Sequence, residues 1–563
     1  MVHAASGRVR LQVVIALAAA LVLTAVLGYV ALTATTVMVP EAGGTYTEGI
    51  AGSPMFINPV LSQANPVDQD LVALVFSGLT RVDSQGTVQP DLAERWEVSG
   101  YGMVYTFFLR QDATWHDGAP VTSSDVVFTV NVMQHDGYEG MSFLSTMWRT
   151  VVVEQLDTYV VRFILREPFA PFLDYTTIGL LPAHVLGSVD VSVLSRSAYN
   201  ATPIGTGPFA VEDIDSQRIV LARYEGYYGA RPYLDRLELY FHPDSASVLE
   251  ARKRGEIMGM GRVGAQQIAQ VQQDPELELY SAPLSGYNLV FLNLDRAIFQ
   301  DRLVRQAMMW ALDRQALVDE ILDGQGMVID TPILPQSWAH NQDVTQYARD
   351  LRKSRSLLEQ AGWFDDDGDG VRERGDLRLE FSLATNGDDA TRVAMIRMIS
   401  EQLAEVGIRA VPESVEWEEL VGQRLRLRQY DAVLSGWQSL PADPDPYPYW
   451  HSSQVNEDSV NFANYISSEA DALLAEARRT ADVDQRWSLY QRFQELFSQD
   501  VPSLLLYQPV YTFAVDKAVM GIQIAPMASS GERFATLPEW HLTVKRMMYA
   551  EARDQGLITP ALP

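Results

Sequence analysis

The chain of 563 residues carries 43 Lys and Arg against 72 Asp and Glu, a formal charge of −29, and it has no cysteine. At about 100–200 residues per domain, this length predicts two to four domains or lobes. The acidity argues against nucleic acid as a partner, since phosphate binding needs a basic surface. The lack of cysteine excludes disulfides, thiolate zinc sites, iron–sulfur clusters, cysteine nucleophiles and a lipid-modified cysteine anchor.

The N-terminus predicts a location outside the cytoplasm. Arg8 and Arg10 precede an uncharged segment, Leu11 to Pro40, and the first acid is Glu41. The apolar part of this segment, Val13 to Leu32, would be about 30 Å long as a helix, enough to span a bilayer. Positive charge before the segment and acid only after it indicate a cytoplasmic N-terminus with the body outside.

We therefore expect residues 1–40 to form an uncleaved signal-anchor helix with its linker. A cleaved signal peptide is the alternative, because small residues surround Leu32-Thr33-Ala34. Residues 1–40 hold two Arg and no acid, so the exported body carries −31.

The first half of the body alternates strand patterns with loops, and Pro203 to Pro208 has the composition of a loop. Runs rich in β-branched and aromatic residues predict strands at Thr45 to Ile50, Val104 to Leu109, Val151 to Val153, Val160 to Leu165, Leu234 to Phe241 and Leu277 to Leu294.

The next part is helix-rich and ends in a β–α–β unit. Asp301 can cap a helix that Gly324 would stop. Alternation from Leu377 to Leu383 predicts a strand, and helical spacing from Val393 to Val406 predicts a helix before the strand that begins at Ile408. Such a crossover implies parallel strands covered by a helix.

Two more helices are expected after the proline-rich loop Pro441 to Pro448, followed by a last long strand from Ser503 to Val515. The second helix places four aromatic residues on one face, which we interpret as core packing: Trp487, Tyr490, Phe493 and Phe497.

We do not expect an enzyme. The sequence has no G-x-S-x-G elbow, no H-E-x-x-H and no phosphate loop, and its eight histidines are scattered. A glycosidase-type carboxylate pair is not excluded by counting, but most carboxylates of an acidic protein solvate its surface.

One Asp/Gly loop has the spacing of a calcium site. Asp365, Asp367 and Asp369 occupy positions 1, 3 and 5, the carbonyl of Val371 position 7 and Asp376 position 12. The Asp at position 12 has a shorter side chain than the usual Glu, and a predicted strand follows the loop instead of a helix. The prediction is a structural calcium ion, with a solvated turn as the alternative and no other cofactor required.

A second motif, Gly436-Trp437, follows a predicted strand and precedes Asp443-Pro444-Asp445-Pro446. The indole could stack on a ligand and the acids could pair with a cation. The alternative is that Trp437 fills the core and the acids begin turns.

Several short segments, each weak alone, recur in order along the body: Pro90 to Trp96, Tyr105 to Arg110, Trp115-His116-Asp117-Gly118, Asp125 to Phe128, Pro203 to Phe209, Val304 to Ala307 with Asp313-Arg314, and Ala361-Gly362-Trp363 before the Asp/Gly loop. Together they resemble the peptide/nickel-type solute-binding proteins of ABC importers, family 5, from about Gly44 to about Trp540.

That resemblance implies an α/β, two-lobed clamp of the class II periplasmic-binding-protein type. Lobe I would comprise residues 41–282 and 508–563, with an extra subdomain at about 54–200, and lobe II residues 283–507. Ligand would favour the closed state of the two lobes.

In peptide-binding members, ligand backbone pairs with extended segments of both lobes and an acid binds the free ammonium. By resemblance, Asp443 matches that acid and Asp445 is the alternative; the base for a ligand carboxylate has no match, and Arg392 is a candidate only. The implied ligand-binding positions are Ser62, Gln63, Ala64, Asn65, Tyr287, Asn288, Gly436 and Trp437. Trp115 to Gly118 is interpreted as structural.

The resemblance implies a monomeric receptor for oligopeptides or dipeptides, held at the outer face of the membrane by its own helix. It would work with two permease subunits and two ATPases. Other family ligands (oligosaccharides, nickel complexes, opines) are alternatives, as are an extracellular hydrolase on the same scaffold and a sensor that signals through a partner.

Overall fold

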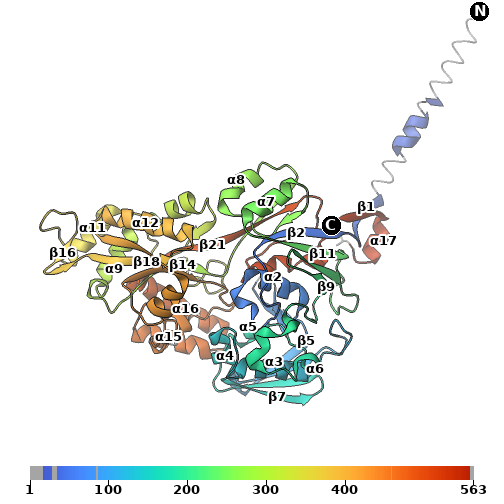
Figure 1. Cartoon of the computed structure of the whole chain (residues 1–563), viewed down its shortest axis with the longest axis horizontal. Coiled ribbons are helices and arrows are strands. Elements are labelled where there is room, and N and C mark those ends of the chain that lie inside the picture. The colour runs from blue at the N-terminus through green and yellow to red at the C-terminus, as the bar shows by residue number, and fades with distance from the viewer. Residues whose placement is uncertain (1–16, 19, 28–34, 84–85, 458, 558–563) are drawn as a thin grey trace, which may run out of the picture.

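The computed structural model describes residues 17–18, 20–27, 35–83, 86–457 and 459–557, which form an α/β body of two lobes (Figure 1). Part of the predicted membrane segment, Val13 to Leu32, lies outside these residues. Among the helices that are described, none combines the length and apolarity that a bilayer crossing requires.

One mixed sheet of 12 strands runs through both lobes. Figure 1 shows its long strand β21 extending from one lobe into the other. Its order is β19 (Arg409–Val415), β18 (Glu380–Asn386), β20 (Ala432–Trp437), β14 (Tyr287–Leu292), β21 (Ser503–Asp516), β12 (Gly259–Met260), β2 (Thr45–Ala51), β11 (Arg236–His242), β10 (Arg218–Arg223) and β9 (Phe209–Ile214), with β13 (Leu277–Pro283) and β15 (Gly326–Val328) also paired to β21.

The long strand β21 belongs to both lobes. Its first half, from Ser503 to Tyr507, pairs with β14, and its second half, from Val510 to Asp516, pairs with β13. The predicted run Leu277 to Leu294 is therefore two strands, broken at residues 284–286, where the chain passes from one lobe to the other.

Lobe I packs its core from residues between Tyr46 and Ala282 together with residues between Tyr511 and Trp540. The extra subdomain holds a sheet of order β5 (Ala93–Ser99), β6 (Val104–Leu109), β8 (Val160–Leu165) and β7 (Val151–Asp157), and the strands β3 (Thr80–Val82) and β4 (Val88–Pro90) form a separate pair. The helices of this lobe are α2 (Pro66–Val75), α3 (Ser123–Gln134), α4 (Ser142–Trp148), α5 (Phe172–Tyr175), α6 (Ala183–Leu186), α7 (Ser245–Lys253) and α8 (Ile268–Val271).

Lobe II contains the predicted β–α–β unit. The strands β18 and β19 are parallel, and α12 (Ala390–Ala404) packs on both of them. The side chain of Asp389 caps α12 by accepting a hydrogen bond from the backbone N–H of Arg392. The further helices are α9 (Arg302–Ala311), α10 (Arg314–Ala316), α11 (Leu351–Gln360), α13 (Trp417–Glu419), α14 (Tyr447–Trp450), α15 (Ser468–Arg479) and α16 (Val483–Asp500), and the strands β16 (Glu373–Arg374) and β17 (Leu377–Arg378) form a small hairpin.

Two predictions for lobe II need correction. Asp301 does cap a helix, but α9 ends at Ala311 because Asp313 caps a second helix by accepting from the N–H of Ala316. On α16, Tyr490, Phe493 and Phe497 are buried as expected, whereas Trp487 is 48% exposed. Trp487 lies in the first turn and a half of α16, on a part of the helix surface that no other element covers fully.

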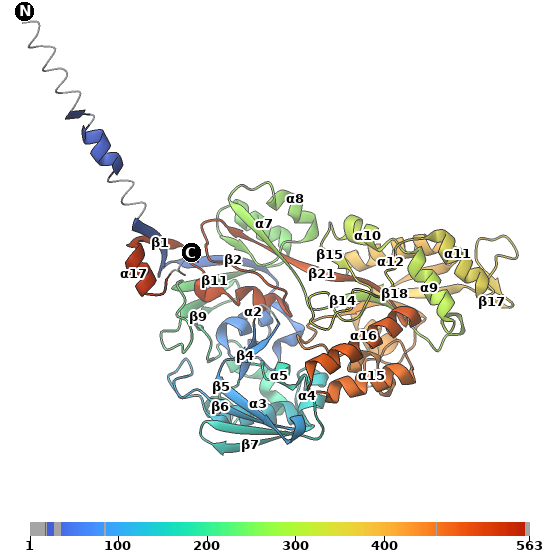
Figure 2. The ribbon, with the colours of Figure 1, turned by 180° about the vertical axis from the view of Figure 1, so that it is seen from behind.

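The first and the last strand of the body pair at the far end of lobe I. The strands β1 (Thr36–Glu41) and β22 (Thr543–Met548) form a separate antiparallel ribbon beside α17 (Tyr549–Asp554). Figure 2, from behind, shows the N-terminal helix leaving the body at this ribbon, away from lobe II.

Candidate ligand-binding site

Four of the predicted site residues are neighbours in the lobe II sheet. The strands β14 and β20 pair so that Tyr287 lies opposite Trp437 and Asn288 opposite Gly436. A Cβ on Gly436 would lie 2.5 Å from the backbone oxygen of Tyr287. Only glycine therefore lets the two backbones approach this closely.

Among the described residues, the end of β20 has no sheet partner along one of its edges. On the side away from β14, β20 pairs with β18 only at Leu383 opposite Ala432 and Ala384 opposite Val433. Residues 435–437 therefore extend beyond the last described pairing with β18. An unpaired edge of this kind can accept the backbone of an extended ligand.

The aromatic rings of this pair are directed into lobe II. Tyr287 is buried, and its hydroxyl accepts a hydrogen bond from Nε1 of Trp450 at 3.3 Å. The indole of Trp437 stacks on Phe462 with ring centroids 5.2 Å apart and lies 4.7 Å from the ring of Tyr449. These contacts fit the core-packing interpretation of Trp437, and they engage the indole with the rings of two neighbours in lobe II, Tyr449 and Phe462.

Arg392 lies beside this backbone. Its guanidinium approaches Oδ1 of Asn288 at 3.4 Å and Oγ of Ser435 at 3.5 Å. Its described acidic neighbour is Asp389, three residues earlier on α12, with 3.4 Å between Nε and Oδ2. These distances are at or beyond the long end of hydrogen bonding, so the guanidinium keeps donors for another group.

The predicted lobe I segment is a turn, not an extended strand. Ser62 to Ala64 forms one 3₁₀ turn, and Asn65 caps α2 by accepting a hydrogen bond from the N–H of Val67 at 2.9 Å. Gln63 donates to the carbonyl of Pro59 at 2.6 Å. A cap residue followed by proline starts a helix at this point, which prevents the expected strand-like geometry.

Both predicted ammonium-binding acids are already paired with arginines of lobe II. Asp443 binds the guanidinium of Arg486 through both carboxylate oxygens. Asp445 likewise binds Arg478, with 2.9 Å from Nε to Oδ1 and 2.6 Å from the terminal nitrogen to Oδ2. Burial raises the pKa of Asp443, while Arg486 opposes that rise. As arranged here, neither acid is free to bind a ligand cation.

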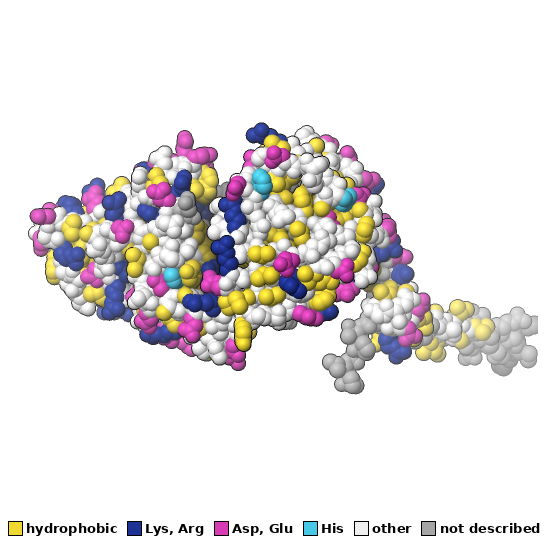
Figure 3. Space-filling model, turned by 90° about the horizontal axis from the view of Figure 1, so that it is seen from below, with side chains coloured by type: hydrophobic (Ala, Val, Ile, Leu, Met, Phe, Trp, Pro, Cys, Tyr) yellow, Lys and Arg dark blue, Asp and Glu magenta, His cyan; other side chains and the backbone are white. Residues whose placement is uncertain are grey.

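The same loop touches lobe I. The backbone N–H of Asp443 donates to Oδ2 of Asp174 at 2.7 Å, and the N–H of Ala170 donates to the carbonyl of Arg478 at 3.0 Å. The guanidinium of Arg478 also lies 5.0 Å from the ring centroid of Phe169. The two lobes therefore meet at this edge, beside the furrow between them that Figure 3 shows from below, with Lys and Arg side chains along it.

Sequence reasoning missed Asp174, Arg478 and Arg486. Arg478 follows its partner by 33 residues and Arg486 by 43, and each lies on a helix whose placement against the loop is tertiary. The sequence holds one signal for the two arginines: Arg478 lies near the end of the first predicted helix and Arg486 near the start of the second, on either side of the short loop between them.

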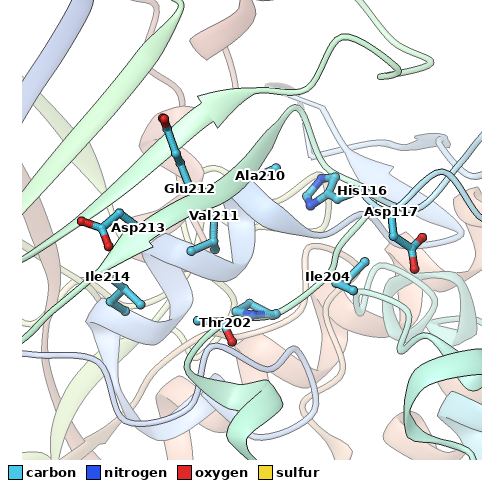
Figure 4. Close-up of a pocket in the computed structure, with 10 residues that line it drawn as sticks. His116, Asp117, Thr202, Ile204, Ala210, Val211, Glu212, Asp213 and Ile214 are labelled. Atoms are coloured by element: carbon cyan, nitrogen blue, oxygen red, sulfur yellow. The ribbon is translucent and has the colours of Figure 1, made fainter.

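A cavity of about 430 Å³ lies elsewhere, in lobe I between His116-Asp117, the loop at Thr202 to Ile204 and the edge strand β9 (Figure 4). His116 holds the loop: its Nδ1 accepts from the N–H of Gly205 at 3.1 Å and its Nε2 lies 3.0 Å from the oxygen of Gly207. Burial lowers the pKa of His116 to about 4. A neutral imidazole with both nitrogens occupied has the structural role predicted for this motif.

The Asp/Gly loop gathers a different set of carboxylates from the one predicted. Oxygens of Asp365, Asp367 and Glu373 lie within 4.8 Å of one another. Asp369 instead pairs with Arg378 at 2.6 Å, and Asp376 is outside the group. The two oxygens of Asp365 accept from the N–H groups of residues 368 and 370. These amide contacts are also those of a solvated turn, so calcium stays a prediction.

Comparison with known proteins assigns the family. The model of the bacterial extracellular solute-binding proteins, family 5, matches residues 87–459. Oligopeptide-binding protein AppA of Bacillus subtilis (strain 168) is 31% identical over 496 residues, which cover 86% of this chain and 90% of AppA. Dipeptide-binding protein of Escherichia coli (strain K12) is 27% identical over 507 residues, which cover 84% of this chain and 91% of that protein.

A solved structure agrees with the sequence comparison. The structure of AppA from Bacillus subtilis in complex with a nonapeptide superposes with a TM-score of 0.73 at 29% identity, covering 90% of this chain and 100% of that one. Because the family model covers most of the chain and the relatives match over nearly their full length, the chain belongs to the bacterial extracellular solute-binding proteins of family 5.

Proposed function

We propose that this protein captures peptides between its two lobes and delivers them to the permease of an ABC importer. The observation that carries the proposal is the strand edge at residues 435–437 beside Asn288 and Arg392, because it offers backbone groups and a cation together. Every peptide carries the same N–H and C=O groups, so backbone pairing tolerates many side chains.

Peptide is favoured over the other ligand classes by the relatives. AppA is named for oligopeptides and was solved with a nonapeptide, and the Escherichia coli relative is named for dipeptides. The pairing of Asp443 and Asp445 with arginines favours ligands that do not depend on an acid at this loop for their ammonium group. Longer peptides, recognised along their backbone, meet that condition better than dipeptides.

Arg392 is proposed to bind a carboxylate of the ligand. It is half-buried next to Ser435, and a planar guanidinium suits a carboxylate better than a neutral amide. Amidating the C-terminus of a bound peptide should then weaken binding about tenfold or more. Isothermal titration of the free and amidated peptide measures this difference. Arg392→Gln should abolish it, and Arg397→Gln, an exposed arginine on the same helix, should preserve it.

This role implies two permease subunits and two ATPases as partners, and no nucleic acid. The receptor would be a monomer, and the transporter would recognise its closed form. Ligand must bind the closed form much better than the open one for this recognition to work. The hydrogen bond from the N–H of Asp443 to Asp174 joins the two lobes and supports this proposal.

The N-terminal segment is proposed to tether the receptor to the outer face of the membrane. Its support is that large apolar side chains on the described part of this helix, Leu17, Leu21, Val22, Leu23, Val26 and Leu27, are all more than half exposed. Such a helix needs an apolar environment. Sequencing the N-terminus of the mature protein decides: a start near Thr35 would show cleavage and contradict the tether.

Native mass spectrometry of the protein, purified without added ligand, tests the main proposal. A copurified peptide, released intact on denaturation, is the expected result. A sugar or a metal complex in its place would refute peptide binding and keep the family role. Cleavage of added peptides would instead show hydrolysis and contradict a receptor that only binds.

A further inference from the structure

The ribbon that joins the two ends of the body has two unlike faces. In the antiparallel pair of β1 and β22, Met38 lies opposite Arg546, and Val37 lies opposite Met547. Side chains alternate between the faces of a strand, so these pairs belong to opposite faces. One face is packed: Val39, Met547 and Ala552 of α17 form a small buried core.

The other face carries exposed methionines on either side of Arg546. Met38 is 55% exposed and Met548, two residues beyond Arg546 on the same face, is 51% exposed. The next residue, Tyr549, is also exposed. Exposed methionines and a tyrosine on an isolated ribbon indicate contact with something apolar on one side and wet on the other.

The charge of the ribbon differs from that of the body. Lys545 and Arg546 are both exposed, and neither forms an ion pair with a described residue. Across residues 36–41 and 543–557 the acids and bases are equal in number, with Glu41, Glu551 and Asp554 against Lys545, Arg546 and Arg553, in an exported body of −31. The ribbon is thus one place where this acidic protein can approach an anionic surface without net repulsion.

The ribbon follows the apolar N-terminal segment closely in the sequence, which favours the membrane surface as its partner. β1 begins at Thr36, four residues after Leu32, the last residue of the apolar segment. Four extended residues span at most about 14 Å. If the segment is in a membrane, β1 is therefore held within the headgroup layer or just above it, because this layer extends about 5–8 Å beyond the hydrocarbon.

We propose that the uncovered face of the ribbon (Met38, Arg546 and Met548, with Tyr549 just beyond its end) rests on the headgroups of an anionic lipid bilayer. The inference depends on the proposed N-terminal tether and adds a second contact to it. Tyrosine and methionine enter the interface, and the guanidinium of Arg546 pairs with lipid phosphates. The contact restricts tumbling of the body about its single tether and sets the direction in which the furrow between the lobes faces.

The absence of cysteine makes a direct test practical. Met38→Cys and Met548→Cys, each the only thiol in the full-length chain, are labelled with an environment-sensitive fluorophore and reconstituted in liposomes of phosphatidylcholine with 30% phosphatidylglycerol. The matched control is Val483→Cys, which is 55% exposed at the start of α16 in lobe II. We expect a lipid-attached spin label to quench the probes at 38 and 548 severalfold more than the probe at 483, and iodide in the water to show the reverse order.

Charge provides a second measurement. Replacing phosphatidylglycerol by phosphatidylcholine should reduce the quenching at position 548, and the variant Arg546→Gln should remove that dependence on lipid charge. Probes at 38 and 548 as accessible to iodide as the probe at 483, in chains that still float with the liposomes, would overturn the contact and leave the tether standing. Chains that fail to float would overturn both. Shielding that appears only when the permease is present would assign the face to a protein and not to lipid.

Discussion

The carboxylate of Asp174 in lobe I accepts a hydrogen bond from the backbone N–H of Asp443 in lobe II, with 2.7 Å between Oδ2 and N. The other oxygen, Oδ1, is buried without a hydrogen-bond partner among the described residues. Burial raises the pKa of Asp174 to about 7; the carboxylate of Asp443 adds to the rise, while the hydrogen bond from the amide of Asp443 and the charge of Arg486 oppose it. A group at the interlobe contact therefore titrates near neutral pH.

Ligand affinity is expected to depend on pH through this contact. If opening exposes Asp174 and returns its pKa to about 4, closure takes up a proton, so the closed state is stabilised below pH 7 and loses that stabilisation as pH rises through 7. The Kd of a bound peptide should be up to about tenfold lower at pH 6 than at pH 8. Isothermal titration measures it. Asp174→Asn keeps an acceptor for the amide of Asp443 and should flatten the profile; an unchanged slope in this variant would assign the titration to another group.

A buried ion cluster should dominate the stability of lobe I. The guanidinium of Arg533 binds Glu48 on β2 and Asp70 on α2, at 2.5 and 2.7 Å, with all three side chains almost fully buried. Arg533→Met would leave two buried carboxylates without a cation and should cost about 3–5 kcal/mol of unfolding free energy. Urea denaturation measures this loss. Arg492→Met, at an exposed pair with Glu469, is the control and should change little.

The close approach of β14 and β20 makes Gly436 a sensitive position. In Gly436→Ala the new Cβ would lie 2.5 Å from the oxygen of Tyr287. Separating the strands should cost about 1–3 kcal/mol and also weaken peptide binding. Gly422→Ala is the control, because nothing lies within 4 Å of its Cβ. Equal stability and affinity in both variants would show that the strand edge does not contact ligand.

Calcium binding by the loop at residues 365–376 is tested with a chelator. If Asp365, Asp367 and Glu373 hold an ion, excess EGTA should lower the Tm of the wild type and should not lower that of Asp365→Asn. Asp369→Ala is a weaker test than the spacing suggests, since Asp369 pairs with Arg378 and its loss changes the Tm without any metal. A Tm indifferent to the chelator would support the solvated turn.

The sequence by itself determined the local elements and the family. The alternation at Thr45 to Ile50, the helical spacing at Val393 to Val406 and the long strand at Ser503 to Val515 predicted β2, α12 and β21, because each depends on residues within a few positions of one another. Their order, together with the family motifs, sufficed for the two-lobed α/β fold that the comparisons support.

Only the tertiary structure decided which polar groups of the site are available. Nothing near Asp443 and Asp445 in the sequence indicates a partner for either acid. In the fold α15 and α16 pack beside the loop, so that Arg486 binds Asp443 and Arg478 binds Asp445. Conversely Arg392, without a family match, lies at Asn288 because α12 packs on the lobe II sheet that contains β14. The pattern along a chain encodes burial and periodicity, but the partner of a charge depends on which distant elements meet, and that is a property of the packed fold.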